Sequence, residues 1–334
     1  MSRSRMRRPP GAVAVLLALL VGAGGSAGVL LAARDRSGDV EVVEGMAEVL
    51  QVQPNDAPAE NFLLVGSDSR EGVDPNAPNA PELGLAEDFV GRRSDTIMIL
   101  RRERNGGASL LSIPRDLWVP IAGRGESNRV NSSYNDGPAV LASTITQALG
   151  IPIQHYVEID FVGFQDLVDA IGGVEICSML AAQDFISGLQ LDPGCHNLDG
   201  QQALAFTRSR QYQEFADGEW RTDQTGDIGR MGRQQQFIRN AADKVLEQVQ
   251  ADPFSLDRML DAATRSLRID GSLDPVRAAT ALRDAAAIGL TTYVLPVVGA
   301  EVDGKSVVEL TADAEPILDY FRGTGSAPPT TTPG

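Results

Sequence analysis

The chain has 334 residues, of which 43% are hydrophobic and 5% aromatic, and its formal net charge is −16. This length is enough for one large domain or two small ones with a full hydrophobic core. An acidic chain lacks the basic face that nucleic-acid binding requires, so we exclude that class of function.

An arginine-rich start precedes a long uncharged run. Residues 1–10 contain four arginines and no acid, and no charged residue occurs from Gly11 to Ala33. At about 1.5 Å per residue, a helix of this length spans a hydrocarbon core of roughly 30 Å. A cleaved signal peptide is the alternative, but its apolar region usually covers about 7–15 residues, and we find no convincing cleavage site. We therefore expect a protein of the cell membrane with a single transmembrane anchor at 11–33. By the positive-inside rule, the stub at 1–10 lies in the cytoplasm and the remainder of the chain lies outside it.

The remainder is acidic, so a group of arginines within it is conspicuous. The first 33 residues contribute a charge of +4, which leaves about −20 for the rest of the chain. Residues 34–60 are acidic and polar and end in QPNDAPAE, which is typical of a spacer. The apolar run at 61–66 predicts a buried strand, and the Pro-, Asn- and Gly-rich residues 71–92 predict a long loop.

Strand and helix patterns alternate over the rest of the chain. An Asn-Gly-Gly turn at 105–107 joins two strand patterns and predicts a hairpin. The alternation predicts an α/β fold with a mixed central β-sheet covered by helices, in a single domain at 61–322. A low-complexity, disordered tail is expected at 323–334. The other predicted strands are 95–102, 109–114, 155–160 and 291–297, and the predicted helices are 137–150, 161–173, 199–210, a long helix from 228, 254–268, 274–287 and 314–321.

Two cysteines, Cys177 and Cys195, lie in the part expected outside the membrane. In an oxidising compartment an even number favours one disulfide, which would close a loop of 19 residues and stabilise the fold by roughly 3 kcal/mol. The alternative is two unpaired, small apolar side chains. A zinc site at Cys195 and His196 is disfavoured, because no second pair of ligands is present.

Charged side chains fall at the ends of several predicted elements. They follow the first and third strands, precede the second, and lie at the end of one helix and the start of the long one. These residues are Asp68, Arg70, Arg93, Asp95, Arg115, Asp116, Arg208, Arg210, Asp227, Arg230 and Arg233, with Gln234 and Gln235 beside them.

Two arguments favour one shared anion site. Loops at strand ends converge in α/β sheets, which is where ligands bind. Arg230, Arg233 and Gln234 have the i, i+3, i+4 spacing of one helix face. Guanidinium groups bind phosphate oxygens in pairs, and Asp68 with Asp95 would hold a hard cation such as Mg²⁺. Arginines and a metal ion around a diphosphate are typical of phosphoryl transfer.

Each segment also has a structural interpretation when it is taken alone. Residues 66–70 would then be an ordinary Asp turn, and residues 93–95 would lie at a surface edge of the sheet. The arginines at 208–210 would only interact with the dipole at the end of their helix. Composition and spacing favour the shared site without excluding these readings. Nucleophilic and zinc enzymes find little support, because the sequence has no Gly-x-Ser-x-Gly, His-Glu-x-x-His or Walker motif and only two histidines.

Taken in order, seven segments within about residues 60–250 resemble the LytR-CpsA-Psr family, whose domain is also described as a cell envelope-related transcriptional attenuator. The resemblance implies a membrane-anchored, extracytoplasmic phosphotransferase. Such an enzyme moves a glycopolymer from a polyprenyl-pyrophosphate carrier onto peptidoglycan through a phosphodiester. The segments are NFLLVGSDSR, RSDTIMIL, LLSIPRDLWVPI, RVNSSYNDGP, VEIDFVGFQDLVDAIGGVEI, LDGQQALAFTRSR and GDIGRMGRQQQFI.

The resemblance also implies roles for individual residues. Asp68 and Asp95 match the magnesium carboxylates, and an apolar tunnel for the lipid is expected between the sheet and the helices at 137–150 and 161–171. We assign catalytic roles to Arg93, Arg115, Arg208, Arg210, Asp227 and Arg230, and substrate binding to Arg70, Asn131, Arg233 and Gln234.

One segment departs from the family pattern. Between Arg210 and Asp227 lie 16 residues, more than in many family members from Firmicutes. This length leaves the role of Arg221 open and favours an actinobacterial branch, for which an arabinogalactan-type acceptor reaction is expected.

Two other functions fit the same residues. A polyprenyl-pyrophosphate hydrolase would use water as the acceptor and release no glycan linkage. A non-enzymatic envelope regulator would bind prenyl phosphates tightly without turnover.

Overall fold

The structure of the protein is a computed structural model, which describes residues 40–51, 59–68, 94–104, 107–251, 255–273 and 290–329. The predicted stub and anchor at 1–33 lie outside these residues, as do Arg70, Arg93 and the helix predicted at 274–287. None of the described helices is both long and apolar enough to cross a membrane.

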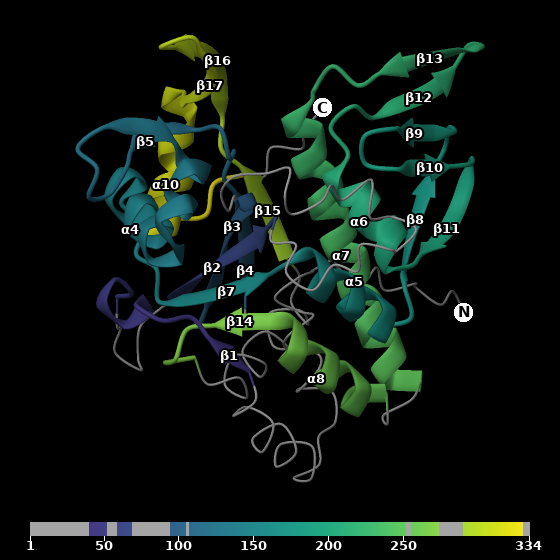
Figure 1. The fold of residues 1–334 in the computed structure, drawn as a ribbon, viewed down its shortest axis with the longest axis horizontal. Coiled ribbons are helices and arrows are strands. Elements are labelled where there is room, and N and C mark those ends of the chain that lie inside the picture. Colours follow the sequence, from purple (N-terminus) through teal and green to yellow (C-terminus); the bar gives the residue numbers. More distant parts are fainter. Residues whose placement is uncertain are drawn as a thin grey trace, which may run out of the picture.

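A mixed sheet forms the centre of the described fold (Figure 1), as the alternating patterns predicted. Strands β2 and β3 pair antiparallel, as do β3 and β4, whereas β7 runs parallel to β2 and β15 parallel to β4. The carboxyl ends of β2 and β4 and the start of β3 therefore meet at one end of the sheet. The sheet order is β1 (Glu41–Val42), β14 (Leu267–Ile269), β7 (His155–Ile159), β2 (Ala59–Ser67), β3 (Ser94–Glu103), β4 (Ala108–Ser112) and β15 (Leu290–Val294).

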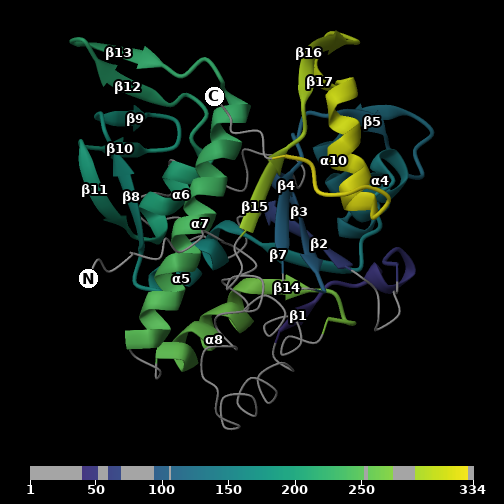
Figure 2. The ribbon, with the colours of Figure 1, turned by 180° about the vertical axis from the view of Figure 1, so that it is seen from behind.

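Helices cover both faces of the sheet because its central strands are apolar on both sides. On β2, Phe62 and Leu64 contribute to one core, and Leu63 and Val65 to the other. Figures 1 and 2 show the two helical layers on either side of the strands. The first layer consists of α5 (Phe161–Ala170), α6 (Gly200–Arg208), α7 (Asp227–Ala251) and α8 (Ser255–Ser266), and the second of η4 (Val130–Asp136), α4 (Pro138–Leu149) and α10 (Glu315–Arg322).

Short strands, absent from the sequence predictions, form small sheets around the central one. These strands, of three to six residues, carry too few alternating positions to be recognised from their pattern. They are β5 (Trp118–Pro120) with β6 (Ser127–Arg129), β8 (Val174–Ser178) with β11 (Gly194–Leu198), β16 (Val297–Val302) with β17 (Lys305–Leu310), and the sheet β10 (Leu189–Leu191), β9 (Ala182–Asp184), β12 (Gln213–Ala216), β13 (Glu219–Thr222).

The segment expected to be a spacer at 34–60 is partly built into the fold. Its β1 extends the central sheet by pairing with β14, and Met46 in the short helix η2 (Met46–Glu48) is buried in the core. The first residues of the expected tail are also part of the described structure, because the Tyr293 hydroxyl donates to the Pro328 carbonyl.

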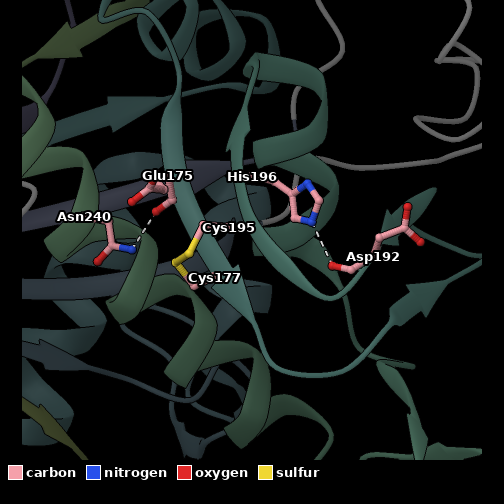
Figure 3. Close-up of a disulfide and its surroundings, with 6 residues drawn as sticks. All are labelled: Glu175, Cys177, Asp192, Cys195, His196 and Asn240. Carbon is pink, nitrogen blue, oxygen red and sulfur yellow. Dashed lines mark hydrogen bonds between the residues drawn. A yellow bond between two sulfur atoms is a disulfide. The ribbon is translucent and has the colours of Figure 1, made fainter.

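The predicted disulfide is present between Cys177 on β8 and Cys195 on β11 (Figure 3). The two cysteines are directly opposite each other in the antiparallel pair. Both are exposed to solvent. The strand β8 in turn packs on α7, where the Asn240 side chain donates to the Glu175 carbonyl. The disulfide therefore holds together the antiparallel pair of β8 and β11, which lies against the middle of the long helix.

We predict that the double variant Cys177→Ala/Cys195→Ala lowers the free energy of unfolding by about 3 kcal/mol, because the unfolded chain gains loop entropy. Urea unfolding of the wild type and the variant measures the difference. The wild type treated with a reductant is the matched control and is expected to lose the same amount. A variant as stable as the oxidised wild type would contradict this prediction.

Candidate functional site

An irregularity in the β2–β3 pairing positions Asp95. Gly66 pairs with Thr96, but the next residue, Ser67, pairs with Ser94, so that Asp95 is the extra residue of a β-bulge. Bulges change the direction in which a side chain points and often occur beside active sites. The Asp95 carbonyl accepts a hydrogen bond from Arg230 Nη1 at 2.7 Å. The bulge thus turns one residue of a central strand toward the start of α7.

The Asp95 carboxylate joins two further arginines. Arg115, which follows β4, donates from Nη1 to Asp95 Oδ1 at 2.6 Å, and Arg210, which follows α6, donates from Nη2 to the same oxygen at 2.9 Å. Burial raises the pKa of Asp95, but attraction to Arg210, Arg115 and Arg230 outweighs burial and lowers this pKa below its usual value. The carboxylate is therefore ionised at neutral pH.

Asp227 is the second carboxylate of this group. Arg230 Nη2 lies 2.7 Å from Asp227 Oδ1, and the Nε atoms of Arg115 and Arg210 lie 3.7 and 3.9 Å from it. Arg230 is only 2% exposed, and its burial lowers the pKa of its guanidinium although Asp227 opposes this effect. We call Arg115, Arg210, Arg230, Asp95 and Asp227 the arginine cluster. Its three cations and two anions leave one positive charge, which suits an anionic ligand.

Gln234 and Arg208 lie beside the cluster. The Gln234 side chain donates to the Thr96 hydroxyl at 2.9 Å and to the Thr207 carbonyl at 3.1 Å, and so joins α7 to β3 and α6. The Arg208 guanidinium lies over the Phe161 ring, 4.4 Å from its centroid. Both residues line the same cavity as Asp95 and Arg230.

This cavity, of about 170 Å³, extends from the arginine cluster into the layer between the sheet and the helices. Its wall is almost entirely apolar, and its polar residues gather near the cluster. The helix at 161–170 lines it, as expected, but the helix at 138–149 does not, because α4 packs on the opposite face of the sheet. The apolar wall is formed mainly by Phe62, Leu64, Met98, Leu100, Val157, Ile159, Phe161, Phe164, Leu167, Val168, Ile171, Leu204, Phe237, Ile238, Leu267 and Leu273.

Two residues predicted to bind substrate have other contacts. Arg233 shares the helix with Arg230, but its Nη2 donates to the Ser209 carbonyl and its guanidinium lies over the Tyr212 ring. It lines a different cavity from Arg230, so the i, i+3 spacing did not bring the two side chains to one site. The main-chain amide of Asn131 donates to the Arg115 carbonyl and so supports the backbone that carries Arg115.

The residue types at the sheet end fit a magnesium ion. Asp68 follows Ser67 and Asp95 follows Ser94, and these two serines are paired across β2 and β3, which brings both aspartates to the same end of the sheet. Magnesium is usually held by one or two carboxylates together with phosphate oxygens. Among the described residues, three potential ligand atoms gather only at Glu175 with Cys177 and Cys195, whose sulfurs form the disulfide.

Asp184 is a buried carboxylate that our sequence analysis missed. Its side chain is 1% exposed. Oδ2 accepts from the Ser209 hydroxyl and from the amides of Arg210 and Gln211, and Oδ1 accepts from two amides of its own turn. Because the contacts of Oδ2 join residues 25 or more positions apart, no local pattern reveals them. Asp184 holds the backbone from which Arg210 reaches the cluster.

Comparison with known proteins gives a consistent result. The model of the LytR_cpsA_psr family matches residues 32–316. The chain is 30% identical over 305 residues to the cell wall biosynthesis protein LcpA of Corynebacterium glutamicum, covering 81% of this chain and 57% of LcpA. It is 34% identical over 189 residues to TagU of Enterococcus faecalis, named a polyisoprenyl-teichoic acid–peptidoglycan teichoic acid transferase, covering 56% and 57% of the two chains.

The chain spans about half the length of the curated relatives it matches. Among solved structures, the LytR-Csp2A-Psr enzyme from Actinomyces oris has a similar fold, with a TM-score of 0.61 and 24% identity. The superposition covers 84% of this chain and 94% of that one.

We predict that Asp184→Asn lowers the free energy of unfolding by about 2–4 kcal/mol. Both oxygens of the carboxylate accept hydrogen bonds, whereas the amide side chain has only one acceptor oxygen and would place its NH₂ group against other donors. Asp192→Asn, at an exposed aspartate, is the control and is expected to change stability by less than about 0.5 kcal/mol. Chemical unfolding at pH 7 measures both.

The same variant carries a pH prediction. Burial raises the pKa of Asp184, but hydrogen bonds from Ser209 and from main-chain amides outweigh burial and lower it. A depressed pKa contributes stability that is complete above the unfolded value of about 3.9 and is lost as the pH falls through the folded value. The difference between wild type and Asp184→Asn should therefore shrink below about pH 4. A difference that stays constant down to pH 2 would be inconsistent with this role.

Proposed function

The chain belongs to the LytR-CpsA-Psr family, and from this we propose that it is a phosphotransferase of cell wall assembly. It would move a glycopolymer from a polyprenyl-pyrophosphate carrier onto peptidoglycan and form a phosphodiester. The observation that carries the proposal is the position of the arginine cluster at one end of an apolar cavity. A cationic end and an apolar interior are complementary to a molecule with a pyrophosphate head and a hydrocarbon tail.

In the proposed reaction, a hydroxyl oxygen of the acceptor attacks the phosphorus that carries the glycopolymer. A phosphorus–oxygen bond forms, the bond to the bridging oxygen of the pyrophosphate breaks, and polyprenyl phosphate leaves. The proton of the acceptor hydroxyl passes to the leaving phosphate, directly or through water. Arg115, Arg210 and Arg230 neutralise the charge that moves onto the leaving phosphate. Their guanidinium groups are already oriented by Asp95 and Asp227, so little reorganisation is needed during the reaction.

Asp227 is best suited to orient Arg230 in this scheme. Its Oδ1 lies within hydrogen-bond distance of two nitrogens of that guanidinium. The same oxygen attracts Arg115 and Arg210 at longer range. These contacts hold the carboxylate of Asp227 against the guanidinium groups of the cluster. We therefore assign Asp227 to positioning rather than to removing the proton of the acceptor hydroxyl.

We propose Mg²⁺ as the cofactor, held by Asp68 and Asp95 together with pyrophosphate oxygens. When bound, it would neutralise pyrophosphate charge and hold the head group beside the arginines. Asp95 Oδ1 accepts hydrogen bonds from Arg115 and Arg210, and a carboxylate has a second oxygen for a cation.

We further propose that the domain lies outside the cytoplasm and is attached to the membrane through residues 11–33. The exposed Cys177–Cys195 disulfide supports this location, because such bonds persist in oxidising compartments. A lipid-linked donor would also place the substrate at the membrane surface.

We predict that Arg115→Ala lowers the rate of glycopolymer transfer by about 10²–10³-fold, because the leaving phosphate loses one of its charge partners. Purified lipid-linked donor and peptidoglycan serve as substrates, and formation of the glycan–peptidoglycan linkage is measured. Arg124→Ala is the matched control, since Arg124 forms an ion pair with Asp136 outside the cluster, and it should transfer at the wild-type rate.

The outcomes separate the competing functions. Unchanged transfer by Arg115→Ala would refute the role of the cluster. Release of polyprenyl phosphate without a linkage to peptidoglycan would instead identify a hydrolase. Tight donor binding without any turnover would identify a prenyl-phosphate-binding regulator.

A second prediction tests the apolar cavity. Leu167 on α5 lines the cavity and is buried, so Leu167→Trp should fill part of the space that a long prenyl chain would occupy. We expect the KM for a donor with a decaprenyl chain to rise about tenfold, equivalent to roughly 1.4 kcal/mol. The control is a donor with two isoprene units, whose KM should change less than twofold. Equal KM changes for both donors would place the lipid elsewhere.

A further inference from the structure

A second cavity, of about 520 Å³, lies on the other side of α6 and α7. It is bounded by β8 and by the hairpin of β12 and β13, and we call it the hairpin pocket. Its volume is within the range of about 300–1,000 Å³ that is usual for ligand sites. The hairpin pocket is lined by Ile176, Cys177, Ser178, Phe206, Tyr212, Glu214, Ala216, Arg221, Thr222, Asp223, Arg233 and Gln236.

The hairpin is formed by the segment between Arg210 and Asp227. Its base is closed by a hydrogen bond from the Asp223 amide to the Tyr212 carbonyl at 2.7 Å. Glu214 and Arg221 form a cross-strand pair, and both side chains belong to the pocket lining. Successive residues of a strand point to opposite faces, so this pair forms one wall of the pocket.

Arg233 on α7 lines the pocket and is held in place by contacts of its own. Its side chain is 9% exposed. Its two terminal nitrogens bind the Ser209 carbonyl and Asp223, and its plane lies over the Tyr212 ring. Its Nε is buried and has no hydrogen-bond partner among the residues described. The contacts of the terminal nitrogens fix the guanidinium as a rigid part of the pocket lining.

The chemistry of the lining favours a neutral polar ligand. Two carboxylates, Glu214 and Asp223, balance two guanidinium groups, Arg221 and Arg233, so the pocket has no net charge to attract a phosphate. Hydroxyl and amide side chains accompany them, and one wall is apolar. Closely spaced donors and acceptors beside an apolar surface are complementary to a saccharide, whose hydroxyl groups alternate with apolar C–H faces.

The hairpin pocket is close to the arginine cluster but separate from the apolar cavity. Tyr212 follows Arg210 by two residues, and Arg233 follows Arg230 by one helical turn. The attacking and leaving oxygens of a phosphoryl transfer lie roughly in line on opposite sides of phosphorus. If the lipid leaves through the apolar cavity, the acceptor must approach from another direction. The hairpin pocket provides such a direction.

We infer that the hairpin pocket binds the glycan strand of the acceptor. This inference rests on the proposed transfer to peptidoglycan and identifies where the acceptor is held. Glu214 and Arg221, the charged pair on the hairpin wall, bind saccharide hydroxyl groups. The hairpin segment 211–226 thereby contributes to the choice of acceptor.

The test is isothermal titration calorimetry of the full-length chain in detergent. The probe is a tetrasaccharide of alternating N-acetylglucosamine and N-acetylmuramic acid without stem peptides. Glu214→Gln and Arg221→Gln should each weaken binding at least tenfold. Asp217→Asn is the matched control, because it breaks the exposed Arg221–Asp217 ion pair without altering the pocket lining. It should bind within twofold of the wild type.

Trp220→Thr separates the pocket from the other face of the hairpin, where Phe215 and Trp220 form an exposed aromatic pair with ring centroids 5.3 Å apart. This variant should also bind within twofold of the wild type. A loss in Trp220→Thr equal to that in Glu214→Gln would overturn the inference, as would wild-type binding of free stem peptides but not of the tetrasaccharide. So would the absence of tetrasaccharide binding.

Parallel titrations with a polyprenyl pyrophosphate distinguish the two proposals. Wild type that binds the pyrophosphate but not the tetrasaccharide refutes the hairpin pocket alone. Wild type that binds no pyrophosphate refutes the proposed function itself. Glu214→Gln should bind the pyrophosphate as the wild type does, which also shows that the variant is folded.

Discussion

The Asp95 residue binds arginines from three separate parts of the chain at one end of the central sheet. Its carboxylate accepts from Arg115 and Arg210, and its carbonyl accepts from Arg230. Guanidinium groups held this closely repel one another. An oppositely charged pair at 4 Å is worth about 4 kcal/mol at an effective dielectric constant of about 20, so Asp95 and Asp227 offset this repulsion. Asp95 thus links the bulged start of β3 to three other elements. These are the end of β4, the end of α6 and the start of α7.

The positions of α6 and α7 follow from this constraint and divide the space around the cluster. One side of the two helices borders the apolar cavity, and the other borders the hairpin pocket. Asp184 supports this arrangement by accepting hydrogen bonds from the Ser209 hydroxyl and the Arg210 main-chain amide. A cationic centre between an apolar and a neutral polar cavity suits a reaction in which a lipid-linked phosphate is the donor and a saccharide the acceptor.

Much of the site was predictable because its residues lie at the ends of strongly patterned elements. Asp95, Arg115 and Arg210 flank apolar strands or a helix, and the structure brings them together. Side-chain direction was less predictable. Arg233 has the spacing of Arg230 and Gln234, but its partners, Ser209 and Asp223, lie on a segment that crosses the other side of α7. Helical spacing defines a face about a third of a turn wide, and neighbouring elements decide which cavity each residue enters.

The amino-acid sequence by itself determined the alternation of strands and helices, the charged residues at their ends and the pairing of the two cysteines. These follow from local periodicity and from counting, which act over a few residues. Tertiary structure alone decided that Asp95 sits in a bulge, that α4 covers the face opposite the apolar cavity, and that the segment 211–226 builds a hairpin over a second pocket. Each depends on contacts between residues far apart in the chain, such as those of Asp184 with Ser209 and of Arg230 with Asp95. Their free energy exists only once the elements are packed.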